Sequence, residues 1–374
     1  MLQQCTAAGD PAPRIGITLV ACVLAVAAGH ASAAQAKPQE PASYCAYDLG
    51  DNLVVAAINN RNQLAGTAIQ GELAQAFVWD WERGVRLLGV LPEAAISVGS
   101  DINDHGEVVG HSGGGGLLQQ AFIWDEQNGM RRVVALGGES SSALRINDVG
   151  DIMGLSSSAA GDGEHMYFRD HNGDVVDLGD GIPFDLNGFS QLGFSRQAQQ
   201  PPPASDVFTW HWKTGEERLA GFPENRLILP SALNNRMHIV GSIASEDGFA
   251  HAIRWTPRKG MEVLGPPDEP GLFSHASDVN EWGTVVGYMD LGVQIRPFIW
   301  RSRKTGRRDL ATMIDPTSPT VPQAETIEPR ALNDLGWIAL YAHDRVGTNP
   351  RSYVLTPKFR NDDSPCAAAP GAGD

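Results

Sequence analysis

Apolar and polar residues alternate over short runs in this chain, and an apolar residue followed by Asn recurs along most of its length. The pairs are Ile58-Asn59, Ile102-Asn103, Ile146-Asn147, Leu186-Asn187, Leu233-Asn234, Val279-Asn280 and Leu332-Asn333. Successive Asn residues are 44, 44, 40, 47, 46 and 53 residues apart. A period of this length predicts a repeat array, in which each repeat is one supersecondary unit that needs its neighbours to bury a core.

Each repeat carries the pattern of four short strands. The first strand ends at the Asn, and a turn such as Asn147-Asp148-Val149-Gly150 follows. Asn can bond its own backbone two residues on, and Gly takes the left-handed conformation that turns the chain back. The second strand, such as Glu107-Val108-Val109-Gly110, contains a Gly that suggests a bulge or a close approach of neighbouring backbone.

A column of aromatic residues marks the third strand, and its regular spacing indicates core packing rather than a binding stripe. It contains Trp79, Trp124, Trp210, Trp255 and Trp300. A polar turn ending in Gly follows, and the fourth strand resembles Val175-Val176-Asp177-Leu178-Gly179. The lack of a sustained apolar period of 3.6 residues excludes helical repeats.

The pattern therefore predicts an all-β chain with a single β-propeller of seven four-stranded blades, with six or eight blades as alternatives. The last repeat lacks a fourth strand, whereas Tyr47-Asp48-Leu49-Gly50 near the N-terminus matches the fourth-strand pattern. We expect this N-terminal strand to join the last blade and close the ring, because closure removes the open sheet edges. The propeller is expected at residues 44–360.

The two ends of the chain are expected to lie outside the propeller. Arg14 precedes an apolar run from Ile15 to Ala28, and Ala31-Ser32-Ala33 supplies a cleavage site. This layout predicts a signal peptide at residues 1–33, and hence a periplasmic or extracellular protein. The alternative is a lipoprotein anchored through Cys22, which ends a lipobox-like run. A short linker at 34–43 and a disordered tail at 361–374 complete the predicted organisation.

Cysteine usage agrees with export. Of four Cys residues, only Cys45 and Cys366 lie beyond the predicted signal peptide. An even pair in an exported protein predicts a disulfide. If the N-terminal strand joins the last blade, this bridge would staple the seam of the ring.

The acidic charge balance argues against nucleic acid as a partner. The formal net charge is −16, and removal of the signal peptide leaves it unchanged because Asp10 and Arg14 cancel. An acidic chain without clustered Lys or Arg has no electrostatic footprint for nucleic acid, so we interpret the acidity as serving solubility. No other segment is apolar enough to predict a membrane span. We expect a monomer that needs no cofactor.

The repeat resembles the bacterial extracellular repeats named for a His-Ala-Phe tripeptide, the HAF repeats. His251-Ala252-Ile253 is closest to the namesake, and Gln75-Ala76-Phe77 and Gln120-Ala121-Phe122 are relaxed versions. The Ile-Asn-Asp-x-Gly turn and the Val-Val-Gly strand belong to the same pattern, which covers about residues 47 to 356. The resemblance implies export and a repeat β architecture, and it brings no established activity. Met166-Tyr167-Phe168 and the Gln/Pro-rich segment 197–203 depart from it.

Two common kinds of chemistry find little support. Asp101-Ile102-Asn103 resembles the start of a calcium loop, but further carboxylates at regular intervals do not follow. We therefore predict no metal site. No Gly-x-Ser-x-Gly nucleophile elbow occurs either.

The position two residues before each Asn is the most informative for function. Its residue type varies between small and charged, and its members are Ala57, Asp101, Arg145, Asp185, Ala232, Asp278 and Ala331. Variation at one level of a rigid repeat is typical of a binding surface, so Asp101, Arg145, Asp185 and Asp278 are the predicted ligand-binding residues. The alternative is that they are solvated residues near a strand end.

Two functions follow from this set. The first is an exported, non-catalytic propeller that binds a protein or a glycan on one face. The alternative is a secreted polysaccharide hydrolase or lyase that uses these acids at the channel mouth, since paired carboxylates are the groups that glycoside hydrolysis needs.

Overall fold

The computed structural model describes residues 39–115, 117–197, 204–246, 248–265, 273–292, 294–322, 324–344 and 349–367. These residues belong to one compact unit, Gln39–Asp374. The predicted signal peptide at 1–33, the alternative anchor at Cys22 and the predicted linker as far as residue 38 lie outside the described residues. Within the described part of the chain, no helix has the length and apolar character needed to cross a membrane.

The described strands form seven groups of four. Blade 1 comprises β2 (Leu53–Ile58), β3 (Leu64–Gln70), β4 (Leu73–Asp80) and β5 (Gly84–Leu87), and blade 2 comprises β6 (Ile96–Ile102), β7 (Val108–Gly114), β8 (Leu117–Asp125) and β9 (Gly129–Arg132). Blade 3 comprises β10 (Gly137–Ile146), β11 (Ile152–Ser158), β12 (Glu164–Arg169) and β13 (Val175–Gly179), and blade 4 comprises β14 (Ile182–Leu186), β15 (Leu192–Gln197), β16 (Ser205–His211) and β17 (Gly215–Arg218).

The remaining three blades follow the same order until the chain reaches the seam. Blade 5 comprises β18 (Ile228–Leu233), β19 (Ile239–Ala244), β20 (Ala250–Thr256) and β21 (Gly260–Val263), and blade 6 comprises β22 (Ser274–Val279), β23 (Val285–Asp290), β24 (Ile295–Trp300) and β25 (Arg307–Asp309). Blade 7 comprises β26 (Thr326–Leu332), β27 (Ile338–His343), β28 (Arg351–Lys358) and β1 (Ser43–Asp51). A short 3-10 helix, η1 (Leu310–Met313), connects blades 6 and 7.

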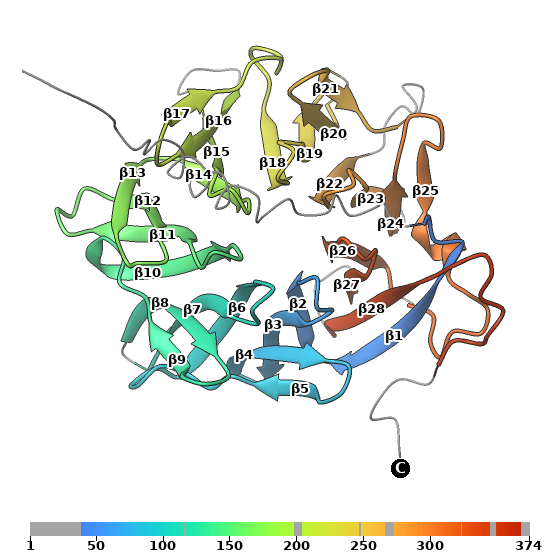
Figure 1. The fold of residues 1–374 in the computed structure, drawn as a ribbon, viewed down its shortest axis with the longest axis horizontal. Coiled ribbons are helices and arrows are strands. Elements are labelled where there is room, and N and C mark those ends of the chain that lie inside the picture. Colours follow the sequence, from blue (N-terminus) through green and yellow to red (C-terminus); the bar gives the residue numbers. More distant parts are fainter. Residues whose placement is uncertain are drawn as a thin grey trace, which may run out of the picture. The chain divides into compact units, whose positions relative to one another are not determined.

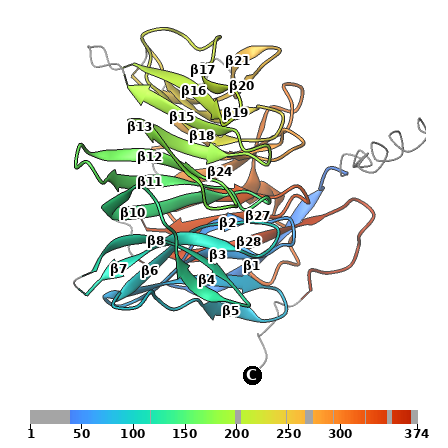
Figure 2. The same ribbon diagram turned by 60° about the vertical axis from the view of Figure 1, so that its left-hand side comes forward.

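The first strand of each blade lies nearest the centre, and these seven inner strands contact one another in ring order. They are β2, β6, β10, β14, β18, β22 and β26, and β26 contacts β2 in turn. Figure 1 looks into this ring, and Figure 2 shows the same blades from the side. Among the described residues, the parallel pair of Ile295 with Thr326 joins the sheets of blades 6 and 7. The fold is a seven-bladed β-propeller, as the repeat predicts.

The N-terminal strand closes the ring as predicted. β1 pairs antiparallel with β28, from Ser43 opposite Lys358 to Asp51 opposite Arg351, and the two ends of the colour scale lie side by side there (Figure 1). The predicted disulfide joins Cys45 to Cys366 across 321 residues of sequence, with 5.7 Å between their Cα atoms. The Cys366 N–H also donates to Thr317 Oγ1 at 3.0 Å. The described part of the predicted tail, 361–367, thus includes a covalent anchor to β1.

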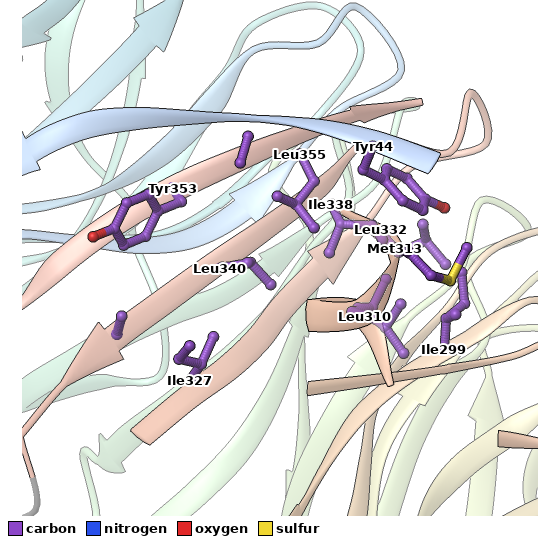
Figure 3. Close-up of a cluster of buried hydrophobic side chains, with 13 residues drawn as sticks. Tyr44, Ile299, Leu310, Met313, Ile327, Leu332, Ile338, Leu340, Tyr353 and Leu355 are labelled. Atoms are coloured by element: carbon purple, nitrogen blue, oxygen red, sulfur yellow. The ribbon is translucent and has the colours of Figure 1, made fainter. Parts of the chain in front are cut away.

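Apolar side chains fill the space between blades. The third strands supply the largest groups, and Phe77, Phe122 and Phe298 are fully buried. At the seam, Tyr44 of β1 packs beside Leu310 and Met313 of η1 (Figure 3). Because close-packed side chains cover both faces of every blade, the inner strands are held rigidly around the axis.

Every inner strand carries a β-bulge at the same place, three residues before the Asn. The register shifts fall between Val55/Ala57, Gly99/Asp101, Ala143/Arg145, Pro183/Asp185, Pro230/Ala232, Ala276/Asp278 and Pro329/Ala331. The recurring Gly of the second strand lies against this bulged strand. A Cβ at Gly110 would lie 1.9 Å from the Val98 carbonyl oxygen, and one at Gly154 would lie 2.0 Å from that of Ser142. The close approach suggested by the glycines is therefore present, and the bulge lies in the neighbouring inner strand rather than at the glycine.

Candidate functional site around the propeller axis

The seven Asn side chains form a closed ring of hydrogen bonds between blades. In each case the Asn Nδ2 donates to the backbone carbonyl of the Asn in the next blade. The pairs are Asn59 to Asn103 (2.8 Å), Asn103 to Asn147 (3.1 Å), Asn147 to Asn187 (3.1 Å), Asn187 to Asn234 (3.4 Å), Asn234 to Asn280 (2.8 Å), Asn280 to Asn333 (3.2 Å) and Asn333 to Asn59 (3.0 Å). The last bond links the final repeat to the first.

The other end of each Asn side chain organises its own turn. Asn280 is typical, because its Oδ1 accepts from the Trp282 N–H at 3.1 Å and from the Thr284 N–H at 3.0 Å. The sequence predicts this turn role, but it does not predict the hydrogen bond from the Asn Nδ2 to the next blade. A signal for that bond exists, however. Asp makes the same turn as readily as Asn, yet all seven positions carry Asn, which alone can donate.

A second ring of hydrogen bonds joins the same turns and is more exposed to solvent than the first. In six of the seven blades, the residue after the Asn donates its backbone N–H to the side chain of the corresponding residue in the next blade. The bonds are Asn60 to Asp104 (2.6 Å), Asp104 to Asp148 (2.8 Å), Gly188 to Asn235 (2.7 Å), Asn235 to Glu281 (2.8 Å), Glu281 to Asp334 (2.8 Å) and Asp334 to Asn60 (2.9 Å). The ring is interrupted between blades 3 and 4, where Gly188 offers no side chain to Asp148.

The two rings line a hollow of about 220 Å³ that opens at the axis, and Asp185 and Asp278 also contribute to its wall. The hollow carries negative charge. Burial raises the pKa of Asp148, Glu281 and Asp334, and neighbouring carboxylates raise these pKa values further. The hollow is therefore a polar, acidic concavity held in place by the two hydrogen-bonded rings.

The four predicted site residues lie deeper, next to the bulges of the inner strands, and the structure brings them together. Arg145 Nε lies 3.2 Å from Asp185 Oδ1, with about a third of the Arg145 side chain open to solvent. Asp101 and Asp278 are close enough that their charges act on Arg145 and on Asp185.

Each of the three Asp side chains bridges two blades by accepting two backbone N–H groups. Asp101 accepts from Ile102 (2.9 Å) and Ile146 (2.9 Å), Asp185 from Leu186 (2.9 Å) and Leu233 (2.7 Å), and Asp278 from Val279 (2.7 Å) and Leu332 (2.6 Å). The inner edge of each blade faces the axis, so its strand N–H groups have no partner strand. The carboxylates of blades 2, 4 and 6 supply acceptors for six of these edge groups.

This deep position changes the acidity of the carboxylates. Burial raises the pKa of Asp101 to about 6 and that of Asp278 to about 7, against the opposing effect of the backbone N–H bonds and Arg145. Burial likewise raises the pKa of Asp185. Burial also opposes the charge on Arg145, but the carboxylates of Asp185, Asp101 and Asp278 outweigh it and raise the Arg145 pKa.

The charged side chains around the axis already have partners within the protein. Both oxygens of each Asp are engaged by backbone groups, and Arg145 is paired with Asp185. Among the described residues, no group of three or more His, Cys, Asp or Glu side chains has the geometry to hold a metal ion.

Comparison with known proteins adds information on the fold. No protein-family model and no curated protein matches this sequence. Solved structures do match. They include an acylaminoacyl peptidase from Pyrococcus horikoshii (11% identity, 83% of this chain and 52% of that chain, TM-score 0.54), a puromycin hydrolase (13%, 83% and 54%, 0.53) and a streptogramin B lyase (12%, 85% and 100%, 0.51).

The likeness is one of fold. At identities of 11 to 13%, shared architecture carries no activity from one protein to another. The chain also spans only about half the length of the peptidase and of the puromycin hydrolase.

Proposed function

We propose that this protein is an exported, non-catalytic β-propeller that binds a protein or a glycan on one face, and that the axial hollow is a binding surface for a protein with a basic segment. The observation that carries the proposal is the hollow itself, an acidic concavity held by hydrogen bonds that run from blade to blade. A pre-formed polar concavity lowers the entropy cost of binding. Opposite charge favours Lys and Arg side chains as its occupants.

The alternative, a polysaccharide hydrolase or lyase, has one supporting observation. The acids lie at the axis, and the pKa of Asp278 is raised to about 7, a value suited to a general acid. Against this, the two oxygens of the Asp278 carboxylate accept the N–H groups of Val279 and Leu332, so both oxygens are already engaged by the backbone. We therefore favour binding over catalysis.

Export is supported by the disulfide between Cys45 and Cys366, because such bonds persist in oxidising compartments. The signal peptide, the periplasmic or extracellular location and the likeness to HAF repeats remain predictions from the sequence.

The proposal can be tested with peptides of known charge. Twelve-residue peptides containing zero, three or six Lys or Arg residues would be titrated by biolayer interferometry at low and at moderate salt. We expect affinity to increase with positive charge and to fall with salt. The double variant Asp104→Asn/Asp334→Asn keeps acceptors for the backbone N–H groups of the second ring but removes two charges, so it should bind at least fivefold more weakly.

Asp174→Asn is the matched control, since it removes one charge from an exposed hairpin outside the hollow. Asp104→Asn and Asp334→Asn are also measured singly. The proposal is contradicted if no basic peptide binds, or if Asp174→Asn weakens binding as much as either of these single variants does. Turnover of a polysaccharide that Asp278→Asn abolishes would establish the alternative instead.

A further inference from the structure

Blades 6 and 7 depart from the repeat at one paired position towards the end of the axis opposite the Asn turns. The pair consists of an inner-strand residue, five positions before the Asn, and its partner on the second strand. In blades 1 to 5 the pairs are Val54 with Thr67, Val98 with His111, Ser142 with Leu155, Ile182 with Ser195, and Leu229 with Ser242. In blades 6 and 7 they are His275 with Tyr288 and Glu328 with Tyr341.

These two unusual pairs form one cluster with Arg330, which we call the tyrosine cluster (His275, Tyr288, Glu328, Arg330 and Tyr341). Arg330 bonds Glu328 at 2.9 Å, and its guanidinium carbon lies 4.9 Å from the centre of the Tyr341 ring. The rings of His275 and Tyr288 are 5.5 Å apart, and the charges of Glu328 and Arg330 act on the Tyr288 hydroxyl.

The cluster is held in place yet remains reachable. His275 Nε2 lies 2.7 Å from Ser231 Oγ, and His275 Nδ1 lies 3.0 Å from Ser242 Oγ, so both ring nitrogens are fixed by blade 5. The Arg330 side chain is 42% exposed, and both Tyr residues are partly exposed. An exposed Arg that is oriented by an acid and by an aromatic ring is pre-organised for a ligand.

The chemistry of the cluster fits a sugar ring. Tyr faces offer apolar surface for the C–H groups of a pyranose, and their hydroxyls bond at the edge. The planar Glu328 and Arg330 groups offer an acceptor beside donors, the combination that neighbouring sugar hydroxyls need. We propose that the tyrosine cluster binds a neutral carbohydrate, at a site separate from the axial hollow.

Charge decides between neutral and acidic sugars. Glu328 neutralises Arg330 locally, and the whole chain carries a formal net charge of −16, which repels a polyanion. Burial and, to a smaller extent, the charge of Arg330 lower the pKa of His275 to about 4, so this ring is uncharged at neutral pH. A weakly basic His275 that is oriented by Ser242 rather than by a carboxylate is also a poor general base for Ser231.

Saturation-transfer difference NMR tests the inference, because it detects weak binding and shows which sugar protons contact the protein. The probes are cellohexaose, xylohexaose, mannohexaose, maltohexaose and chitohexaose, with hexagalacturonate as the acidic probe. We expect at least one neutral probe to bind, with saturation strongest on ring C–H protons. Arg330→Ala and Tyr341→Ala should each weaken binding about tenfold. Arg330→Lys should weaken it nearly as much, because Lys lacks the planar set of N–H donors of the guanidinium group.

The hollow variant Asp104→Asn/Asp334→Asn is the control and should bind the sugar as the wild type does. Failure of all neutral probes, binding of hexagalacturonate alone, or full sugar binding by a folded Arg330→Ala variant would each overturn the inference. Peptide binding at the hollow is measured separately, so either site can fail without the other.

Discussion

A single residue type performs two tasks in this protein. Each Asn of the repeat shapes its own turn through Oδ1 and ties its blade to the next through Nδ2, as Asn280 does with Trp282 and Asn333. The side chains are only 3 to 7% exposed. A buried hydrogen bond contributes about 1 kcal/mol, but an orphaned buried partner costs about 1–3 kcal/mol. The Asn ring is therefore a structural lock that leaves little tolerance for substitution.

The buried carboxylates predict a pH dependence of stability. The pKa of Asp278 is raised to about 7 in the folded protein, above the value of an unfolded Asp. Its contribution to stability is fully present below the unfolded pKa and is lost as the pH rises through about 7. On acidification from pH 8 to 5.5, wild type should gain about 1–2 kcal/mol relative to Asp278→Asn.

Urea unfolding at several pH values measures this difference. Asp174→Asn, in an exposed hairpin, should show no such pH-dependent gap. A wild type that loses stability relative to Asp278→Asn on acidification, or a difference that does not change with pH, would refute the assignment.

At the residue scale the sequence predicted position better than role. It correctly placed the charged column of Asp101, Arg145 and Asp278 around the axis, because one level of a repeat must recur in each blade. It could not show that each carboxylate bonds the next blade, since those N–H groups lie 45 to 54 residues away in sequence. The tyrosine cluster was missed, although the change at the inner-strand position from mostly apolar residues to His275 and Glu328 was a visible signal.

At the scale of the strand, the bulge is the feature that creates the site. It displaces one residue of each inner strand immediately before the charged column, so that Asp101 and Asp185 cap N–H groups at the axial edge. The glycine of the second strand permits the bulge, because a Cβ there would overlap backbone. Sequence analysis could predict the close approach from Gly alone, but not which strand approached.

Gly110→Ala tests this steric argument. A Cβ at Gly110 would lie 1.9 Å from the Val98 carbonyl oxygen and 3.0 Å from the Phe122 ring, so one strand must move. We expect a loss of about 2–4 kcal/mol in the free energy of unfolding, in the range of overpacked cores and broken backbone hydrogen bonds. Chemical denaturation measures it.

Gly129→Ala is the comparison, since that glycine has a φ of +67° but open space around it. Its cost should be only about 1 kcal/mol, from the left-handed backbone alone. Equal losses for the two variants would contradict the close approach as the reason for the recurring glycine.

At the scale of the molecule, closure depends on contacts between the two ends of the repeat array. β1 completes blade 7, the disulfide fixes Cys45 to Cys366, and Asn333 bonds Asn59. The sequence predicted the first two, because a missing fourth strand and a Cys at each end are visible in the chain. The hydrogen bond from Asn333 to Asn59 could not be predicted in this way, because it depends on the geometry of the closed ring.

Removal of the disulfide tests the importance of the seam. Cys45→Ser/Cys366→Ser should lose about 2–4 kcal/mol in the free energy of unfolding, within the usual range for a native bridge. Thermal unfolding of the exported protein with and without reductant measures the effect, and intact mass reports the thiol state. Two free thiols in the exported protein would contradict the bridge, and unchanged stability after its removal would show that the seam does not depend on it.

The most direct test of the ring of Asn locks is the equilibrium unfolding of Asn280→Asp. Asp can keep the turn bonds to Trp282 and Thr284, but it cannot donate to the Asn333 carbonyl. We predict a loss of at least about 2 kcal/mol, similar to that of Asn280→Ala, because a buried carbonyl then faces a carboxylate. Asn225→Asp, at an exposed turn, should be nearly neutral. An Asn280→Asp variant as stable as wild type would show that these residues only make turns.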